Sequence, residues 1–480
     1  MVRILTKDIA SHEDKQVLLS GWVAARRNHG KIIFIDIRDR GGVAQLVFIP
    51  SNKEVYAKAE ALRSEWVITV KGLAKRRPKG MENPNLSNGE FEVPVDELTI
   101  EAEAKTPPIS VDTDGYDIGE DSRMKYRYLD LRRARLAKNM RNRAKMIQFI
   151  REFLSVRDFA EIETPVLSKS TPEGARDYLV PSRLYHGKFY ALPQSPQQYK
   201  QLLMVAGLER YFQIARCFRD EDTRGDRQPE FTQLDLEMSF VKRGDVMDLN
   251  EELLTALVEK LYPNKRIQEK PFPRLTYKEA VEKYGVDGPD LRKDKDDQNL
   301  LAFCWVIDFP FFERATKGSG STGSPQTSKE VWTFTHNPFS APKPEDMEKF
   351  MKGEDVGGIL TTQYDVVLNG FEIGGGSIRN HEPGALKQTF KIMGFAEERI
   401  MNNFGHMIEA LSYGAPPHGG IAWGLDRVVA LLESEPNIRE VIAFPKTGDG
   451  RDLMMEAPSE VDKEQLKELG LKIDEKKASK

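Results

Sequence analysis

Residues 218–237 read FRDEDTRGDRQPEFTQLDLE, a charged turn between the strand-like runs YFQIARC and FTQLDLEMSF. Arg219 ends the first run, Glu221 follows it closely, and Phe231 stands where the second run begins. Such a set can hold a nucleotide, because a guanidinium binds the α-phosphate, a carboxylate can approach the adenine and an aromatic ring can stack on it. A surface run of ion pairs is the alternative reading of the same residues.

Two segments further along the chain carry related chemistry. Residues 364–379, YDVVLNGFEIGGGSIR, contain Asp365 and Glu372, hard oxygen ligands suited to Mg²⁺ shared with ATP phosphates. Residues 419–427, GGIAWGLDR, predict a glycine-rich turn that enters an apolar helix, with Arg427 near the start of the helix. Taken alone, the first could be a flexible turn and the second an ordinary helix start. The order and spacing of all three segments favour the functional reading.

The sequence around these segments predicts an α+β domain over residues 131–480. Apolar residues recur at three- and four-residue steps after Leu131, which predicts an amphipathic helix with one buried face. That face is expected to hold Leu136, Met140, Ala144, Ile147, Ile150 and Leu154. Strand-like and helical segments then alternate to the end, which favours a largely antiparallel sheet with flanking helices. Residues 315–330, ATKGSGSTGSPQTSKE, predict a mobile loop.

The first 105 residues differ in pattern. About five short strand-like runs separated by turn residues predict a small β-barrel of the OB type. Residues 106–130 are rich in Pro, Gly and acidic residues and predict a linker or hinge. The chain therefore reads as an N-terminal barrel, a linker and a larger second domain.

One face of the predicted barrel suits single-stranded nucleic acid. In the strand from Lys31 to Arg38, alternation places Ile33, Ile35 and Ile37 inward and Phe34 outward. Phe34 is then beside Arg27 and His29, with Gln45 on the next strand. Aromatic platforms with arginines bind bases by stacking and charge, and a glutamine can contact a base edge. A Phe packed under a loop, with arginines that are merely solvated, is the alternative.

Composition narrows the class of protein. The chain has 480 residues, 30% of them charged, and a net charge of -4, which argues against a protein bound wholesale to nucleic acid but allows a local basic surface. Its two cysteines, Cys217 and Cys304, are far apart and form no C-x-x-C pair, so structural zinc or a disulfide framework is not expected. No stretch is long and apolar enough to span a bilayer and the start lacks a secretory h-region, so the expected compartment is the cytoplasm, without a membrane partner.

The three segments resemble the class II aminoacyl-tRNA synthetases. The Arg219 segment resembles motif 2 of that family, GLDR at 424–427 resembles motif 3, and FAEIETP at 159–165 resembles motif 1, which in the family lies at the dimer interface. The class I signatures HIGH and KMSKS and a Walker A loop are absent from the sequence. The resemblance implies an OB-fold anticodon-binding domain, a homodimer, ATP with Mg²⁺, and metal ligation by Asp365 and Glu372. It also implies catalytic roles for Arg219, Glu372 and Arg427, and ATP binding by Arg219, Asp220, Glu221, Gln228, Phe231, Glu372, Gly424, Leu425, Asp426 and Arg427.

Within that family, the chain resembles the bacterial aspartate enzymes in TPEGARDY at 171–178 and QSPQQYK at 194–200. By this resemblance Lys200 and Arg379 hold the side-chain carboxylate of L-aspartate, and His336 closes over the amino acid. The resemblance further places four residues around the amino group: Glu173, Ser195, Gln197 and Asp235.

The sequence departs from the bacterial aspartate enzymes in two places, and two further positions bear on which tRNA is accepted. The large inserted domain usual in bacterial members is replaced by a short connection near 285–302, and Asn337 stands where many relatives have a second histidine. His29 and Gly80 match the relaxed members of the family, so the anticodon residues Arg27, His29, Phe34, Gln45 and Gly80 are expected to accept both tRNA(Asp) and tRNA(Asn). The aspartyl product on tRNA(Asn) would then need a separate amidotransferase. Incidental loop residues at positions 29 and 80 are the alternative.

Three other functions remain open at this point. Asparaginyl- and lysyl-tRNA synthetases belong to the same subgroup, although two cations favour a dicarboxylic amino acid, because an asparagine enzyme would not need both and a lysine enzyme would want acidic residues. A non-catalytic tRNA-binding paralogue would not need Arg219, Glu372, Arg379 and Arg427. A tRNA-independent ligase would not need the N-terminal barrel.

Overall fold

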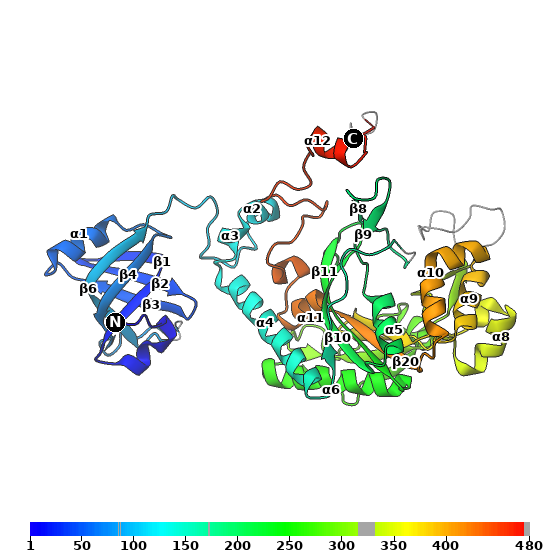
Figure 1. The fold of residues 1–480 in the computed structure, drawn as a ribbon. Helices are drawn as coiled ribbons and strands as arrows, with labels where there is room; N and C mark the ends of the chain where they lie inside the picture. The colour runs from blue at the N-terminus through cyan, green and yellow to red at the C-terminus, as the bar shows by residue number, and fades with distance from the viewer. Residues whose placement is uncertain (85, 87, 171–172, 315–331, 475–480) are drawn as a thin grey trace. The chain divides into compact units, whose positions relative to one another are not determined.

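A computed structural model of the chain describes residues 1–84, 86, 88–170, 173–314 and 332–474. The chain forms two compact units, one spanning Met1–Ala134 and the other beginning at Arg135 (Figure 1). The loop predicted at 315–330 lies outside the described residues, as do Thr171 and Pro172 of the TPEGARDY segment.

The first unit is a closed β-barrel, as the spacing of the strand-like runs predicts. Its six strands run in the order β3-β2-β1-β4-β6-β5, and a parallel pairing of β3 with β6 closes the barrel. Ile33, Ile35 and Ile37 face the core, so the predicted inward and outward faces of this strand are confirmed. The elements are η1 (Thr6–His12), β1 (Gln16–His29), β2 (Ile32–Asp39), β3 (Gly42–Phe48), α1 (Lys53–Ala61), β4 (Val67–Leu73), β5 (Lys75–Arg76) and β6 (Phe91–Ala102).

The segment after the barrel contains two short helices, α2 (Glu120–Lys125) and α3 (Arg127–Asp130). Asp130 is fully buried and its carboxylate accepts hydrogen bonds from three buried arginines, Arg123, Arg127 and Arg133, at 2.6 to 3.2 Å. Burial alone would raise the pKa of Asp130, but the arginine hydrogen bonds bring that pKa below its usual value. An ionic cluster therefore orders this segment.

The second unit is built on an eight-stranded sheet in the order β13-β15-β18-β19-β20-β11-β10-β7. All neighbours from β15 to β10 are antiparallel, and only the two edge strands pair in parallel, which confirms the largely antiparallel sheet. The strands are β7 (Ala160–Glu161), β10 (Arg210–Phe218), β11 (Glu230–Ser239), β13 (Arg274–Thr276), β15 (Phe303–Ile307), β18 (Tyr364–Leu368), β19 (Phe371–Ile378) and β20 (His418–Gly424).

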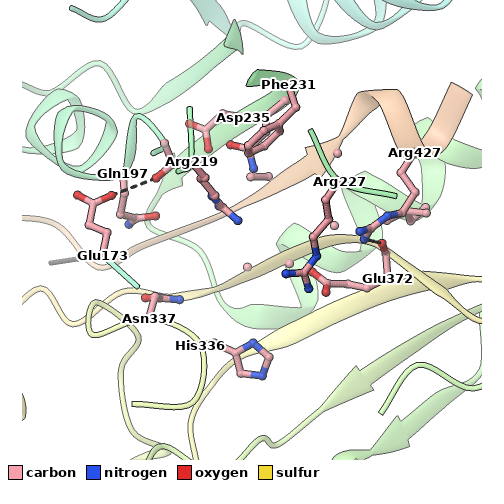
Figure 2. A pocket seen from close by; sticks show the side chains of 18 of the residues that line it. Glu173, Gln197, Arg219, Arg227, Phe231, Asp235, His336, Asn337, Glu372 and Arg427 are labelled. Carbon is pink, nitrogen blue, oxygen red and sulfur yellow. Dashed lines mark hydrogen bonds between the residues drawn. The ribbon is translucent and has the colours of Figure 1, made fainter. Parts of the chain in front are cut away.

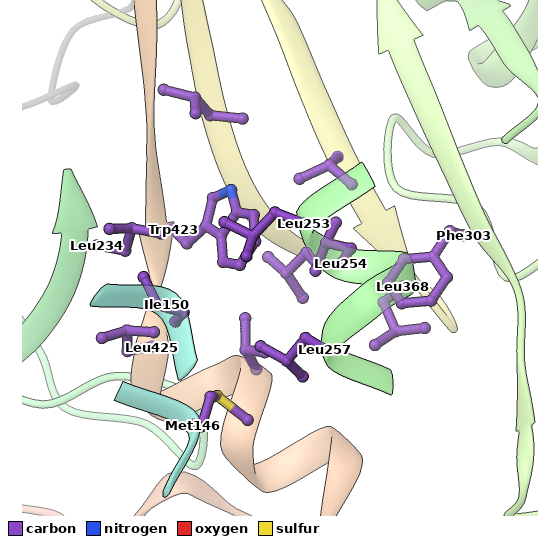
Figure 3. Close-up of a cluster of buried hydrophobic side chains, with 14 of the residues drawn as sticks. Met146, Ile150, Leu234, Leu253, Leu254, Leu257, Phe303, Leu368, Trp423 and Leu425 are labelled. Atoms are coloured by element: carbon purple, nitrogen blue, oxygen red, sulfur yellow. The ribbon is translucent and has the colours of Figure 1, made fainter. Parts of the chain in front are cut away.

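One face of this sheet is apolar and carries the main core. Side chains of α4 (Ala134–Ser155), α6 (Arg243–Leu261) and α11 (Leu425–Leu432) pack there around Trp423 and the leucines of β11 (Figure 3). The predicted stripe of the first helix is partly wrong, because Ala144 is exposed while Met146 and Phe153 are buried. Ala144 has too little apolar surface to decide which face turns inward, so the larger side chains decide it.

The remaining helices surround the opposite face and the ends of the sheet. Figure 1 shows α8, α9 and α10 gathered together, and their apolar residues form a second core with Phe311, Phe312 and Phe334. None of the described helices is long and apolar enough to cross a membrane. These elements are β8 (Leu179–Pro181), β9 (Phe189–Ala191), α5 (Gln197–Val205), β12 (Arg266–Ile267), α7 (Tyr277–Tyr284), β14 (Leu300–Leu301), β16 (Phe312–Arg314), β17 (Trp332–Phe334), η2 (Pro344–Asp346), α8 (Met347–Lys352), η3 (Val356–Gly358), α9 (Pro383–Ile392), α10 (Glu397–Leu411), η4 (Ile438–Val441) and α12 (Lys463–Glu468).

Candidate active site

A cavity of about 400 Å³ lies on the polar face of the large sheet. Strand alternation creates that face, since Leu234 and Leu236 of β11 enter the core while Asp235 and Glu237 turn to the other side. Fifteen of the residues predicted for the amino acid and ATP line this cavity: Glu173, Ser195, Gln197, Lys200, Arg219, Glu221, Gln228, Phe231, Asp235, His336, Glu372, Arg379, Gly424, Asp426 and Arg427. Segments far apart in the sequence thus converge on one site (Figure 2).

Two cations and two carboxylates meet at the buried end of the cavity. Lys200 Nζ lies 2.6 Å from Asp235 Oδ1 and 3.4 Å from Glu237 Oε2. Arg379 donates from Nε and Nη2 to the two oxygens of Glu237 at 2.8 and 3.1 Å. Lys200 and Arg379 therefore converge through Glu237, a residue to which the sequence analysis assigned no role.

The pKa values of the Asp235 and Glu237 carboxyls shift in opposite directions. Burial raises the pKa of Asp235, against the opposing influence of Lys200. Burial also acts on Glu237, but Arg379 and Lys200 together bring its pKa below the usual value. Glu237 is thus the stable counterion of the pair of cations, while Asp235 is the more easily protonated of the two.

Arg379 and Lys200 keep donors for a ligand. The Arg379 guanidinium has five N–H groups, and four of them donate to Glu237, to Ser377 Oγ and to the Gly420 carbonyl. One Nη1 N–H remains without an acceptor among the described residues. The Lys200 ammonium has three N–H groups, and its carboxylate contacts engage two. Each cation can therefore offer one N–H to a further carboxylate.

Glycines in the strands allow Glu237 and the neighbouring backbone to pack closely beside the two cations. A Cβ on Gly420 would overlap Glu237 Oε2 and the Leu236 carbonyl oxygen, and one on Gly376 would overlap the Gly420 carbonyl oxygen. Gly376 lies inside β19 and Gly420 inside β20. Because β20 spans His418–Gly424, the prediction of a turn at 419–424 is wrong. The requirement for small residues comes from tight strand and side-chain contacts rather than from a bend.

A hydrogen-bonded chain behind the cavity orients Gln197. His418 Nδ1 lies 2.8 Å from the Pro416 carbonyl oxygen and must donate to it, so Nε2 accepts from the Gln201 amide at 3.2 Å. Gln201 Oε1 then accepts from Gln197 Nε2 at 3.1 Å. Gln197 is left to present its carbonyl oxygen, an acceptor. The sequence analysis missed His418 and Gln201, because only the register of β20 against β11 brings this histidine beside α5.

Glu173 lies beside Gln197 at the same end of the cavity (Figure 2), and Ser195 also lines this cavity. Ser195 Oγ donates to Glu173 Oε2 at 3.4 Å, and Gln198 Nε2 donates to Glu173 Oε1 at 2.9 Å. Acceptor oxygens from Glu173, Gln197 and Asp235 therefore gather where Lys200 and Arg379 supply donors.

The other end of the cavity carries Glu372 and Arg427, and Arg219 lies between this end and Gln197 (Figure 2). The Arg219 guanidinium lies over the Phe231 ring at 5.1 Å, and its buried Nε has no hydrogen-bond partner among the described residues. Arg427 donates to the Glu372 carbonyl oxygen and to Asp226 Oδ2, the latter at 3.0 Å. Two guanidiniums and an aromatic face thus border the space between the strands.

Three of the residues predicted for ATP binding have contacts within the protein. Leu425 is buried in the main core, and Asp220 reaches the Arg176 carbonyl through its backbone N–H at 3.0 Å and does not line the cavity. Asp426 lines the cavity, but Arg143 and the Thr232 backbone N–H already occupy its two oxygens, at 2.5 and 2.9 Å. Gln228 bonds Lys446 through its side-chain amide, and Glu221 lies 3.8 Å from Arg227.

Asp365 and Glu372 form a carboxylate pair over Gly375. A Cβ on Gly375 would lie 2.8 Å from Asp365 Oδ1 and 3.3 Å from Glu372 Oε1. Burial and the nearby Glu372 charge raise the pKa of Asp365 well above its usual value. Two carboxylates that repel each other in this way suit a divalent cation, which would relieve the repulsion. Among the described residues no group of three or more His, Cys, Asp or Glu side chains is placed to bind a metal, so further ligands would have to come from a substrate.

His336 lies at the cavity wall directly after β17. Its ring meets the edge of Phe309 at a centroid distance of 4.6 Å and remains exposed to the cavity. Asn337, beside it, accepts a hydrogen bond from the Phe339 backbone N–H at 3.0 Å. The asparagine thus shapes the turn that carries His336.

The residues predicted for nucleic acid gather on the barrel with different contacts. Arg27 forms a two-point ion pair with Asp36, at 2.7 and 2.8 Å, beside Phe34, its cross-strand neighbour. Gln45 is largely buried and donates to Glu92 at 3.0 Å. His29 and Gly80 are exposed, and Gly80 has φ +87°, a conformation that favours glycine although nothing crowds its Cβ position.

Comparison with known proteins adds independent findings. Residues 119–448 match the family model described as tRNA synthetases class II (D, K and N), and residues 17–101 match the OB-fold nucleic acid binding domain. The chain is 42% identical to the Aspartate--tRNA(Asp/Asn) ligase of Rubrobacter xylanophilus, over 97% of this chain and 95% of that one. It is 39% identical to the Aspartate--tRNA ligase of Staphylococcus saprophyticus subsp. saprophyticus, over 96% and 97%.

The first of these alignments extends over 587 residues, more than the 480 of this chain. The relative therefore carries a substantial number of residues that this chain lacks. A solved structure with the same fold is that of asparaginyl-tRNA synthetase from Pyrococcus horikoshii complexed with asparaginyl-adenylate. Its TM-score is 0.73 at 23% identity, covering 93% of this chain and 98% of that one.

Proposed function

The chain belongs to the class II tRNA synthetases of the aspartate, lysine and asparagine group, and from this premise we propose that it joins L-aspartate to tRNA at the expense of ATP. The relatives at 39 to 42% identity carry aspartate ligase names, which supports aspartate over asparagine and lysine. The asparaginyl-tRNA synthetase from Pyrococcus horikoshii is only 23% identical to this chain, so its similarity supports the fold but not the choice of amino acid.

The convergence of Lys200 and Arg379 on Glu237 carries the choice of amino acid. A carboxylate side chain can accept one N–H from each cation, and charge-assisted hydrogen bonds of this kind are the strong ones. An asparagine side chain would leave one of these donors facing an amide N–H. A lysine side chain would bring a third cation into a buried site, which is costly.

The acceptors opposite the two cations suit the α-ammonium group. Glu173, the carbonyl oxygen of Gln197 and Asp235 Oδ2 all accept hydrogen bonds, and Asp235 Oδ2 is buried without a partner among the described residues. Ser195 holds Glu173 in place. An L-amino acid with a carboxylate side chain would thus satisfy donors at one end of its length and acceptors at the other.

The opposite end of the cavity would take ATP. Arg219 would bind the α-phosphate, Phe231 would stack on the adenine and Glu221 and Gln228 would border the base, while Arg427 would approach the outer phosphates. Asp365 and Glu372 would hold Mg²⁺, which supplies positive charge to the phosphates when bound. The backbone at Gly424 and Leu425 places Arg427 at the start of α11.

Catalysis then rests on position and charge. The α-carboxylate of aspartate attacks the α-phosphorus, the bond to the bridging oxygen breaks, and pyrophosphate leaves. Arg219, lying between the two ends of the cavity, would stabilise the charge that develops on the α-phosphate oxygens. A ribose hydroxyl of the terminal adenosine of tRNA next attacks the carbonyl carbon and AMP leaves. His336 would close over the bound amino acid and exclude water.

The barrel would bind the anticodon. Phe34 offers a stacking surface and Arg27, held by Asp36, offers a guanidinium beside it. His29, at the end of β1, and Gly80, in a turn, are both exposed, and we propose that they meet the third anticodon base and admit both tRNA(Asp) and tRNA(Asn). Aminoacylation of purified tRNA(Asp) and tRNA(Asn) transcripts tests this. Charging of tRNA(Asp) without charging of tRNA(Asn) would refute the proposal that both are accepted.

A homodimer is also part of the proposal. β7 forms an edge of the large sheet, and Val156, Val166 and Leu167 near it are exposed at 77%, 47% and 53%. Unpaired edges flanked by apolar side chains are typical of covered surfaces. Sedimentation at several protein concentrations tests the dimer.

The direct test of the reaction is amino-acid-dependent exchange of pyrophosphate into ATP. We expect exchange with aspartate and little with asparagine or lysine. Exchange supported by asparagine or lysine instead, or by none of the three in a folded sample, would refute the proposed substrate.

A further inference from the structure

A second cavity of about 240 Å³ lies on the far side of Glu173 and Ser195, which line both hollows. Its wall includes Gln198 of α5 and His406 of α10. These two residues have no part in the amino acid and ATP contacts described above. Both helices contribute apolar side chains to the second core.

The hydrogen bonds across this wall have a fixed direction. His406 Nε2 lies 2.7 Å from Gln198 Oε1, and an amide oxygen can only accept, so this ring nitrogen carries a proton. Gln198 Nε2 then donates to Glu173 Oε1 at 2.9 Å. The reversed amide would place its oxygen against the Glu173 carboxylate, so both ends of the chain require the same orientation.

Gln198 is nine-tenths buried, so its amide cannot turn to water without leaving a polar group unpaired. With Ser195 Oγ on the other oxygen, Glu173 is held at two points. A carboxylate already fixed in its binding conformation loses less entropy when it meets a ligand. Lys169, four positions before Glu173 in the sequence, also contacts α10, where its ammonium group donates to the Asn402 carbonyl oxygen.

We propose that His406, acting through Gln198, is a positioning residue that holds Glu173 for the α-ammonium group of the amino acid. The inference rests on the proposed function, which gives Glu173 that ligand. Both the neutral ring with its proton on Nε2 and the imidazolium can donate to Gln198, so the positioning does not depend on the charge of His406.

Steady-state pyrophosphate exchange on the full-length protein tests the relay. Loss of a hydrogen bond to a charged group should raise the KM for aspartate about tenfold in Gln198→Leu and about fivefold in His406→Phe, with kcat and the KM for ATP little changed. His406→Gln keeps a donor near the same place and should restore most of the wild-type KM. The double variant should match Gln198→Leu alone, because His406 acts through Gln198. His186→Phe, at an exposed histidine in the β8–β9 turn, is the matched control.

Succinate separates positioning of Glu173 from general support of the site. It carries both carboxylates of aspartate but no ammonium group, so its inhibition constant against aspartate should stay within about twofold in His406→Phe. Parallel weakening of succinate and aspartate, or additive effects in the double variant, would overturn the proposal. An inactive wild-type protein would count against the proposed function, whereas an active wild type with unaltered variants would count against this inference alone.

Discussion

Replacing Lys200 by Met probes the cation pair that carries the choice of amino acid. The variant keeps an unbranched side chain one atom shorter and removes the N–H that the proposal directs at the substrate carboxylate. A hydrogen bond to a charged group contributes about 1.5–3 kcal/mol, which predicts a rise of roughly 10- to 150-fold in the KM for aspartate. The KM for ATP should change by no more than about twofold, because Lys200 is at the opposite end of the cavity from Arg427 and Glu372.

The same substitution removes the partner of Asp235, 2.6 Å away and fully buried. Breaking a buried pair typically costs about 3–5 kcal/mol when the remaining charge is left uncompensated. Burial already raises the pKa of Asp235, so this carboxyl can take up a proton and avoid much of that cost. We expect the protein to remain folded with a loss of about 1–3 kcal/mol in the free energy of unfolding.

Pyrophosphate exchange with varied aspartate and varied ATP, alongside chemical denaturation, measures both effects. Lys349→Met is the control, because Lys349 is exposed on α8 and pairs only with Asp355 in the described residues. A folded variant with an unchanged KM for aspartate, or with equal losses for aspartate and ATP, would refute the reasoning.

Three further predictions follow from other parts of the molecule. Gly375→Ala should raise the Mg²⁺ concentration needed for half-maximal exchange several-fold, because the new Cβ would lie 2.8 Å from Asp365 Oδ1; an unchanged Mg²⁺ titration would contradict it. Asp130→Asn should lower the free energy of unfolding by about 3–5 kcal/mol at pH 7, since it leaves buried arginines unpaired. The pKa of Asp130 is lowered in the folded protein, so its contribution to the free energy of unfolding is present above the unfolded pKa of about 3.9 and is lost as the pH falls through the folded pKa. Denaturation between pH 7 and pH 3 should therefore show a steeper loss of stability for the wild type than for the variant. Phe34→Ala should weaken tRNA binding by about 1–3 kcal/mol without altering pyrophosphate exchange, and filter binding with a tRNA transcript checks the first part.

The parts of the fold that follow from local pattern could be predicted from the sequence. Alternation in LDLE at 234–237 sets two leucines toward the core and two carboxylates toward the site, and the isoleucines of β2 behave in the same way. The barrel and the antiparallel sheet follow from such runs. The stripe of α4 was misplaced at Ala144, because a residue with so little apolar surface says little about the direction of a helix.

Contacts set by strand register could not be predicted. GGIAWG at 419–424 has the composition of a turn, yet it pairs with β11 and β19 on both sides, and its glycines admit Glu237 and neighbouring carbonyls. The same pairing brings His418 beside Gln201 and so decides which atom Gln197 presents. Sequence motifs named the residues that line the cavity. The Arg379–Glu237 ion pair and the Gln201–His418 hydrogen bond, by contrast, join residues more than 100 positions apart in the chain.

The account depends most on where the side chain of aspartate binds. A crystal structure of the protein with L-aspartate and a non-hydrolysable ATP analogue would show this directly. We predict that the side-chain carboxylate oxygens lie about 3 Å from Lys200 Nζ and Arg379 Nη1, with the ammonium group beside Glu173 and Gln197. A side-chain carboxylate bound away from both cations, or a phosphate group between them, would contradict the assignment.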